Sequence, residues 1–509
     1  MIAIRKYKYT INAAVLALTM VLGNSCTKDL LTPTPTTSII DSKAFDTPAR
    51  ILSQVNGLYA GVKSGQFYGG RYVIYNEIRG EEFIVNKPNG VTGLDTWNQN
   101  VNSNTNEVVN LWSAAYTAIN RVNVFLAGLA ANSTKVDAAT ASQYTGEAEF
   151  LRALTYFALV QTYAKPYVFD NGASLGLPLR LVDETTLTGT GTNDLARSTV
   201  AQVYTQILKD LDDAETKLPA TPTLANGATR AFKNTAIALK AKVYLAQANY
   251  AKVLTETTKL ISATAPYQSP TGGNKLESSI ATVFGGSYGA PTTVSPEALL
   301  FLPFTTSDAP GTQNQLAYYF TTGTGKGNGE YYLNKSGIYA NAALSGASST
   351  DARKGFITPV SVTDANKVTT IYYYLSKYNT PSPFTDYIPV LRYSEVLLNA
   401  AEAYARTGDL VNATALLNAV RHRSDPAFTF AAADIATQTS LISTILTERR
   451  IELLGEGFRL TDLFRTGQAL PAKSGPQGNS PSVAVTASNY IWPISGVELQ
   501  TNKLIQPNP

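Results

Sequence analysis

The clearest binding chemistry in the sequence lies in an N-terminal segment that is rich in aromatic and amide side chains. Tyr72, Tyr75 and Arg79 lie close together, and Trp97 and Asn100 follow in the polar stretch DTWNQNVNSNTN. Aromatic faces pack against the C–H groups of sugar rings, whereas amide and guanidinium groups hydrogen-bond their hydroxyls. Trp97 has few apolar neighbours in sequence, so we expect its ring to be exposed. These five residues predict a glycan-binding surface.

Further aromatic residues lie later in the chain. Tyr288, Tyr318 and Tyr331 occur in a turn-rich region, where binding loops usually lie, and we expect them to extend the same surface. Trp112, in the segment NLWSAAYTAINRVN, lies on a helical stripe that predicts a place in the core. Tyr393 adjoins a structural motif and is also predicted to pack inside.

Several charged residues could be mistaken for a catalytic cluster, but their positions in helical stretches predict structural ion pairs. The adjacent carboxylates Glu81 and Glu82 do not define the spacing that a glycosidase needs. His422 has no Cys partner and no triad context, so we expect it at a helix end. The charged residues in helical stretches are Arg392, Glu395, Glu402, Glu448, Arg449, Arg450, Glu452 and Arg459.

The glycine-rich run GTGKGNG, residues 323–329, superficially suggests a phosphate loop. Lys326 lacks the Ser or Thr that follows it in such loops, and the strand–loop–helix setting is missing. We therefore predict a flexible loop there, with no cofactor and no catalytic activity.

The N-terminus has the pattern of an export signal. Arg5, Lys6 and Lys8 precede the apolar stretch INAAVLALTMVL, which is too short to span a bilayer and suits a secretory signal peptide. Cys26 follows directly and resembles the acylated Cys of bacterial lipoproteins, although Leu22 lies four residues before it instead of three. We expect residues 1–25 to be a signal peptide and 26–40 a lipidated tether; the alternative is an ordinary signal peptide with an incidental Cys.

Composition excludes several classes of protein. One Cys and one His among 509 residues exclude a zinc site built from those residues and any intramolecular disulfide. The net charge is +4, but without the three basic residues of the signal segment 38 basic residues face 37 acidic ones. The sequence therefore does not predict nucleic-acid binding.

Helical periodicity dominates the remainder of the chain. Thr199 opens a capping-box pattern with Gln202, and Pro219 ends the predicted helix. Two later segments follow one plan: AKVYLAQANYAKVL from Ala241 and AEAYARTGDLVNAT from Ala401 each predict a helix, a tight turn and a second helix. This plan is typical of tetratricopeptide repeats. A further helix is predicted over residues 147–163.

These patterns predict a mainly α fold of tetratricopeptide-like repeats with an irregular, loop-rich subdomain. We expect an N-terminal helical part over residues 41–265, the loop-rich subdomain over 266–389 and a C-terminal repeat region over 390–509, all within one fold. Within the subdomain, residues 368–375 are β-prone.

Five segments resemble the motifs of the SusD/RagB family, in the order in which that family carries them. They are GEAEFLRALTYFALVQTYAKPYV from Gly146, RSTVAQVYTQILKDLDDAE from Arg197, IPVLRYSEVLLNAAEAYARTGD from Ile388, TERRIELLGEGFRLTDLFRTG from Thr447 and YIWPISGVELQTNKLIQPNP at the C-terminus.

The resemblance implies a lipoprotein anchored in the outer membrane that captures oligosaccharide for a SusC-like, TonB-dependent transporter and performs no catalysis. It also implies that Trp97 and the neighbouring residues contribute to the sugar site. Three alternatives remain: a relative that captures peptides, a glycan-degrading enzyme, and a repeat scaffold that binds only proteins.

Overall fold

The structure is a computed structural model that describes residues 43–184, 193–224, 227–284, 295–323 and 327–508. Two compact units divide the chain, residues 1–54 and residues 55–509. All the predicted binding residues fall in the second unit. Cys26 and Tyr288 lie outside the described residues, as do the predicted signal peptide and tether.

Helices make up about 48% of the structure, against a few short strands, which confirms the predicted mainly α fold. None of them is both long enough and apolar enough to span a membrane, within the part of the chain that was described. The helices are α3 (Pro48–Val62), α4 (Arg71–Ile78), α5 (Leu94–Trp97), α6 (Asn106–Ala131), α7 (Ala138–Tyr163), α8 (Val200–Lys217), α9 (Lys233–Ala246), α10 (Tyr250–Thr257), α11 (Ile280–Phe284), α12 (Leu316–Phe320), α13 (Ala342–Ser345), α14 (Tyr393–Arg406), α15 (Leu410–Ser424), α16 (Ala432–Ile435), α17 (Gln438–Glu452), α18 (Arg459–Arg465) and α19 (Gly496–Thr501).

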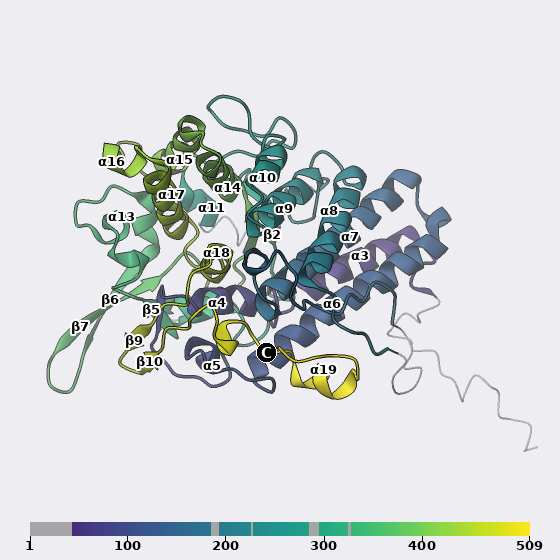
Figure 1. Ribbon diagram of the computed structural model, residues 1–509, viewed down its shortest axis with the longest axis horizontal. Coiled ribbons are helices and arrows are strands. Elements are labelled where there is room, and N and C mark those ends of the chain that lie inside the picture. The colour runs from purple at the N-terminus through teal and green to yellow at the C-terminus, as the bar shows by residue number, and fades with distance from the viewer. Residues whose placement is uncertain (1–42, 185–192, 225–226, 285–294, 324–326, 509) are drawn as a thin grey trace, which may run out of the picture. The chain divides into compact units, whose positions relative to one another are not determined.

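The longer helices pack one on the next in a continuous row. From α6 to α10 each helix contacts its successor, α10 contacts α14, and α14 contacts both α15 and α17. Figure 1 shows this row rising from α6, near the middle of the view, to α14 and α15 near its top. Each helix buries its apolar stripe against its neighbours; in α8, Val203, Ile207 and Leu211 are fully buried. The row forms the frame from which the loop-rich segments extend.

The predicted capping box at the start of α8 is present. Gln202 N donates to Thr199 Oγ1 at 3.2 Å, and Thr199 N donates to Gln202 Oε1 at 2.8 Å. The helix ends at Lys217, two residues before Pro219, as the sequence predicts.

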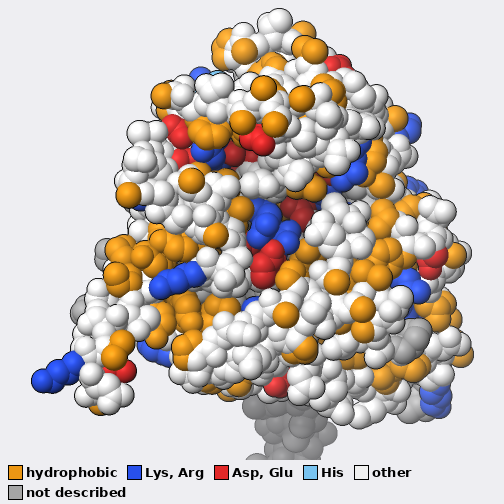
Figure 2. All heavy atoms as spheres, turned by 60° about the vertical axis from the view of Figure 1, so that its left-hand side comes forward, with side chains coloured by type: hydrophobic (Ala, Val, Ile, Leu, Met, Phe, Trp, Pro, Cys, Tyr) orange, Lys and Arg blue, Asp and Glu red, His pale blue; other side chains and the backbone are white. Residues whose placement is uncertain are grey.

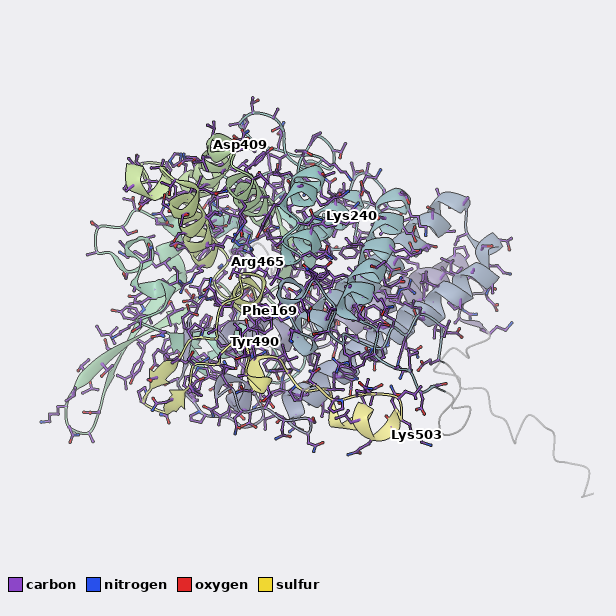
Figure 3. The ribbon with its side chains drawn as sticks, in the orientation of Figure 1. Phe169, Lys240, Asp409, Arg465, Tyr490 and Lys503 are labelled. Carbon is purple, nitrogen blue, oxygen red and sulfur yellow. The ribbon has the colours of Figure 1, made fainter. Side chains whose placement is uncertain are left out.

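The two predicted helix pairs, α9–α10 and α14–α15, turn in the same way. Ala248 and Gly408 occupy equivalent turn positions with φ of 55° and 94°. The next residues, Asn249 and Asp409, each cap the second helix by accepting a hydrogen bond from a backbone N–H three residues on. Figure 3 labels Asp409 at this turn. Because polar caps and a left-handed turn residue recur at the same register, the two segments fold as copies of one plan.

The strands of the described residues form five antiparallel pairs. The longest pair, β6–β7, is a ribbon that extends from the body in Figure 1, and β7 confirms the β-prone stretch predicted over residues 368–375. The prediction of loop throughout 323–329 is wrong at its ends, because Thr322 and Gly323 pair with Asn328 and Gly327. The pairs are β1 (Phe83–Val85) with β5 (Tyr331–Leu333), β2 (Ala298–Leu302) with β8 (Ile388–Arg392), β3 (Thr322–Gly323) with β4 (Gly327–Asn328), β6 (Ile357–Thr363) with β7 (Thr369–Leu375), and β9 (Lys473–Gly475) with β10 (Gly478–Ser480).

Candidate functional site

Trp97 does not lie on the surface, so the prediction of an exposed ring is wrong. The side chain ends the short helix α5 and is 0% exposed. Its indole Nε1 donates to the backbone oxygen of Phe83 at 2.9 Å, and Lys473 Nζ lies 5.1 Å from its ring centroid. These partners come from β1, 14 residues earlier in the chain, and from β9, near its other end. The polar stretch around Trp97 gave no sign of them, and the ring cannot serve as a sugar platform in this arrangement.

The predicted residues of α4 are also buried, which corrects their assignment to the binding surface. Tyr72 is 7% exposed, Tyr75 is 3% exposed and Arg79 is 1% exposed. Tyr75 packs on Trp492 with ring centroids 5.3 Å apart. Arg79 Nη2 donates to the backbone oxygen of Tyr490 at 2.8 Å, and burial lowers the pKa of Arg79 to about 9. These side chains support the loops from within.

The remaining predicted residues have mixed positions. Asn100 is exposed on the loop after α5. Tyr331 is buried on β5, where its ring stacks on Tyr319 at 6.1 Å, so its assignment to the surface is wrong as well. Tyr318, the next residue to Tyr319 on α12, is half-buried and keeps part of its ring at the surface. Trp112 is 3% exposed, as predicted for a core residue.

Tyr318 lies within a surface group of aromatic and amide side chains. Its ring meets the half-buried Phe384 ring edge to face, with centroids 6.2 Å apart. Asn328 Nδ2 donates to the Tyr318 hydroxyl at 3.3 Å. Lys87 Nζ in turn donates to the backbone oxygen of Asn328 at 2.6 Å and to its Oδ1 at 2.9 Å. Three segments that are distant in sequence therefore meet around one tyrosine.

The same group continues along β5 and β7. Asn86 Nδ2 donates to the backbone oxygen of Gly329 at 2.9 Å. Tyr332 lies between Tyr374, at 6.4 Å, and Tyr372, at 4.9 Å between ring centroids. Figure 2 brings forward the side of the structure that holds β6 and β7, where hydrophobic side chains gather with a few Lys or Arg side chains among them. We define the aromatic–amide strip as Asn86, Lys87, Tyr318, Asn328, Tyr332, Tyr372, Tyr374 and Phe384, of which Tyr332 and Tyr374 are buried and the others are at least partly exposed.

A buried carboxylate holds the polar part of this strip in place. Glu330 is 1% exposed, and its Oε1 accepts hydrogen bonds from Asn328 Nδ2 at 3.0 Å and Asn89 Nδ2 at 3.2 Å. Thr92 Oγ1 donates to its other oxygen at 2.5 Å. Because the hydrogen bond to Glu330 fixes the Asn328 amide, its orientation does not depend on a ligand. The strip thus offers partly exposed rings beside preoriented amides, which is the chemistry of sugar recognition.

The sequence pointed to only one member of the strip, Tyr318. Asn86 and Lys87 follow a strand of three residues in the turn-forming run NKPNG, and Phe384 lies among Ser and Pro residues. Neither context distinguishes a binding residue from an ordinary loop residue. The pairing of β1 with β5 brings residues 83–87 beside residues 328–333. The sequence alone does not show that these two strands pair.

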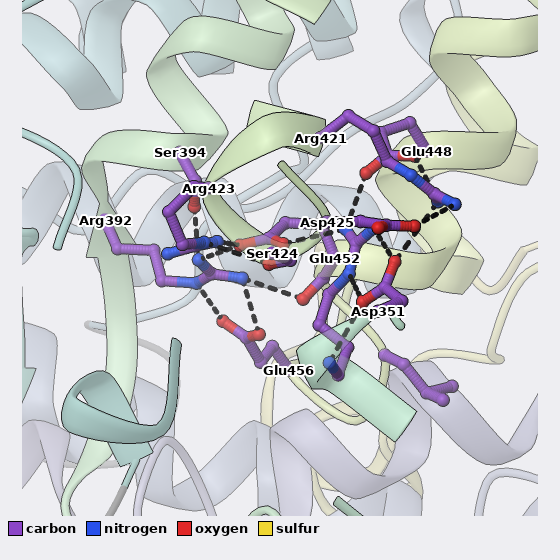
Figure 4. A network of polar contacts seen from close by, with 12 residues as sticks. Asp351, Arg392, Ser394, Arg421, Arg423, Ser424, Asp425, Glu448, Glu452 and Glu456 are labelled. Carbon is purple, nitrogen blue, oxygen red and sulfur yellow. Dashed lines mark hydrogen bonds and ion pairs between the residues drawn. The ribbon is translucent and has the colours of Figure 1, made fainter. Parts of the chain in front are cut away.

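The charged cluster is structural, as the sequence predicts. Arg392 Nη1 lies 2.7 Å from Glu297 Oε1 and 2.6 Å from Glu452 Oε1, and its Nε lies 2.7 Å from Glu456 Oε2 (Figure 4). Burial alone would raise the pKa of Glu452, but neighbouring guanidinium groups, that of Arg423 foremost, hold it well below its ordinary value of 4.5. The network joins β8, α15, α17 and the start of β2.

The other candidate catalytic residues have similar structural roles. Arg450 Nη2 lies 2.8 Å from Glu81 Oε1 and its Nε lies 2.8 Å from Glu82 Oε1. His422 is exposed in the last turn of α15, at the helix end where it was expected, and contacts the backbone oxygen of Phe428. In the parts of the chain that are described, no group of three or more His, Cys, Asp or Glu side chains could hold a metal ion.

Comparisons with known proteins agree with this architecture. The family described as "Starch-binding associating with outer membrane" matches residues 34–245, and the "SusD family" matches residues 316–509. SusD-like protein P2 of Formosa agariphila is 27% identical over 98% of this chain and 99% of its own length. A laminarin-binding SusD-like protein of known structure is 21% identical, covering 91% of this chain and 99% of its own, with a TM-score of 0.70.

The crystal structure of a SusD superfamily protein from Bacteroides fragilis gives a stronger likeness. It is 32% identical, covers 91% of this chain and 99% of that protein, and superimposes with a TM-score of 0.77. The chain therefore belongs to the SusD/RagB family, a family of carbohydrate-binding proteins.

Proposed function

We propose that this protein captures oligosaccharide at the cell surface through the aromatic–amide strip and passes it to a SusC-like, TonB-dependent transporter without cleaving it. In this proposal an acylated Cys26 anchors the protein in the outer membrane. The observation that carries the proposal is the strip itself, in which Tyr318 and Asn328 lie side by side at the surface with the amide already oriented by Glu330.

The strip suits an extended sugar chain. The partly exposed rings of Tyr318 and Tyr372 can each lie against the C–H face of a sugar ring. Between them, the amides of Asn86 and Asn328 and the ammonium group of Lys87 can hydrogen-bond hydroxyl groups. Because aromatic faces accept many sugars, the strip supports capture of a glycan class and does not by itself select one sugar.

The charges around the strip support binding without cleavage. A glycosidase places two carboxyl groups about 5–9.5 Å apart across the scissile bond. The carboxylate that hydrogen-bonds the strip, that of Glu330, is buried and already accepts hydrogen bonds from Asn89, Thr92 and Asn328. It is therefore out of reach of a sugar at the surface.

The proposal is tested by isothermal titration of the protein with a panel of soluble oligosaccharides that includes laminarin fragments, alongside a peptide panel. We expect at least one oligosaccharide to bind, with no new reducing ends after prolonged incubation. Tyr318→Ala should weaken that binding by roughly 5–10-fold, because it removes an aromatic platform worth about 1 kcal/mol.

Two variants serve as controls. Tyr318→Phe keeps the ring and should retain most of the affinity, while Tyr250→Ala removes an equally half-buried tyrosine from α10, outside the strip, and should leave affinity unchanged. Binding of peptides alone would favour the peptide-capturing alternative. Release of reducing sugar would contradict the proposal outright.

A further inference from the structure

A cavity lies beside α6, and none of the residues that line it belongs to the aromatic–amide strip. It has a volume of about 490 Å³ and opens to solvent. That volume falls within the range of roughly 300–1,000 Å³ that is typical of small-molecule sites. Its lining residues come from α6, from the segment after α7 and from α19: Trp112, Ser113, Tyr116, Thr117, Asn120, Arg121, Arg180, Glu184, Asn193, Val497 and Glu498.

One face of α6 supplies half of this lining in two parallel rows. Residues four apart lie one above another on a helix, so Trp112, Tyr116 and Asn120 form one row. Ser113 and Thr117 begin the second row, and both are exposed. The helix thus presents aromatic rings beside hydroxyl groups, the combination that sugar rings require.

The aromatic row is held rigidly at the floor of the cavity. The rings of Trp112 and Tyr116 lie 4.8 Å apart between centroids, and the Tyr116 hydroxyl donates to the backbone oxygen of Pro178 at 3.0 Å. Tyr116 remains partly exposed.

The opposite wall is fixed by a chain of polar contacts. Arg180 Nη1 lies 2.5 Å from Glu184 Oε1, and its Nη2 lies 3.3 Å from Glu498 Oε1. Asn120 exchanges two hydrogen bonds with the backbone of Glu184, at 2.9 and 3.0 Å. This wall is preorganised, so binding a ligand costs little ordering of side chains.

The charges of the lining residues cancel. Arg121 and Arg180 are balanced by Glu184 and Glu498, and both carboxylates are already engaged by Arg180. A site with no net charge favours an uncharged ligand, because an anion or a cation would meet a like charge as often as an opposite one.

We propose that this cavity is a second saccharide site, which takes an uncharged sugar of one or two rings against the partly exposed ring of Tyr116. The inference rests on the proposed function in one respect only, namely that the ligand is a saccharide. The two sites share no residue, so they can be tested separately.

The test uses the fluorescence of the three tryptophans during titration with maltose, cellobiose and laminaribiose. Trp112 lines the cavity, whereas Trp97 and Trp492 do not, so a change produced by a sugar in the cavity is expected to come from Trp112. We expect at least one of these disaccharides to change the emission. The change should persist in Tyr318→Ala, because that variant alters only the strip.

Thr117→Phe fills the cavity from an exposed position on α6, so it should fold normally and abolish the fluorescence change. Ala127→Phe places the same side chain on the same helix at an exposed position outside the lining and should retain the change. The proposal is wrong if none of the disaccharides changes the emission, or if the change survives in Thr117→Phe. Stronger binding of glucuronate than of the disaccharides would overturn the assignment of an uncharged ligand.

Discussion

At the scale of single residues, Glu77 shows how burial in α4 changes the pKa of a carboxyl group. Its Oε1 accepts hydrogen bonds from the backbone N–H groups of Gly457 at 2.7 Å and Phe458 at 3.0 Å. Burial nevertheless raises the pKa of Glu77 to about 7, against an ordinary value of 4.5, and the nearby Glu82 adds to the rise. The carboxyl group is therefore protonated in the folded protein at pH values where it would be ionised in the unfolded chain.

This shift predicts a pH dependence with a definite sign. Since the folded state binds the proton more tightly, the stabilisation is complete below pH 4.5 and is lost as the pH rises through about 7. A shift of that size corresponds to about 3 kcal/mol. Glu77→Gln should remove this decline from the free energy of unfolding, measured by urea denaturation across that pH range. Equal pH dependence in the two proteins would contradict the account.

The residue scale is also where sequence reasoning was least successful. The polar neighbours of Trp97 predict an exposed ring, and Arg79 is predicted to bind sugar beside Tyr72 and Tyr75. Contacts with residues 83, 473 and 490 bury both side chains. Tyr318 was correctly placed near the surface, whereas its partners Asn328 and Phe384 were missed. Burial of one side chain depends on distant strands, and a single sequence does not show which strands will pair.

At the scale of elements, the paired turns of α9–α10 and α14–α15 depend on one backbone conformation. Gly408 has a φ of 94°, which side-chain-bearing residues rarely adopt. No atom lies within 4 Å of the position that a Cβ would take there, so a substitution would meet backbone strain and no clash. The equivalent residue of the first pair, Ala248, accepts a φ of 55°.

Gly408→Ala is therefore expected to lower the free energy of unfolding by about 1 kcal/mol. Gly57→Ala is the matched control: Gly57 lies inside α3 and also has open space around its Cβ position. In a helix interior alanine is favoured over glycine, so this variant should raise stability by about 0.5–1 kcal/mol. Thermal or urea unfolding of both variants gives the comparison. If both variants shift the free energy of unfolding in the same direction, the positive φ of Gly408 is not what makes its replacement unfavourable.

Elements were predicted well where local chemistry determines them. The capping box at Thr199 and the turns before Asn249 and Asp409 are encoded within a few residues, and all are present. The short pairs β1–β5 and β3–β4 escaped prediction because strands of two or three residues show no periodicity. Those pairs build the strip, so the sequence predicted the frame better than the site.

At the scale of the whole molecule, a body of packed helices supports the proposed binding surface. The row of packed helices and the buried Arg392–Glu452 network make a rigid body, while the strip lies on the loops and strands that this body supports. Family resemblance predicted this architecture from motifs spread along the chain, and the likeness to the Bacteroides fragilis structure confirms the family. The export signal and the acylation of Cys26 lie outside the described residues and stay predictions.

The central claim is that the aromatic–amide strip holds an intact oligosaccharide. The most direct measurement is a crystal structure of the protein with the tightest oligosaccharide from the titration panel. We predict an uncleaved sugar chain with one ring against Tyr318 and a hydroxyl within hydrogen-bond distance of the Asn328 amide. Sugar bound elsewhere while the strip stays empty, or a cleaved product in the strip, would contradict this account.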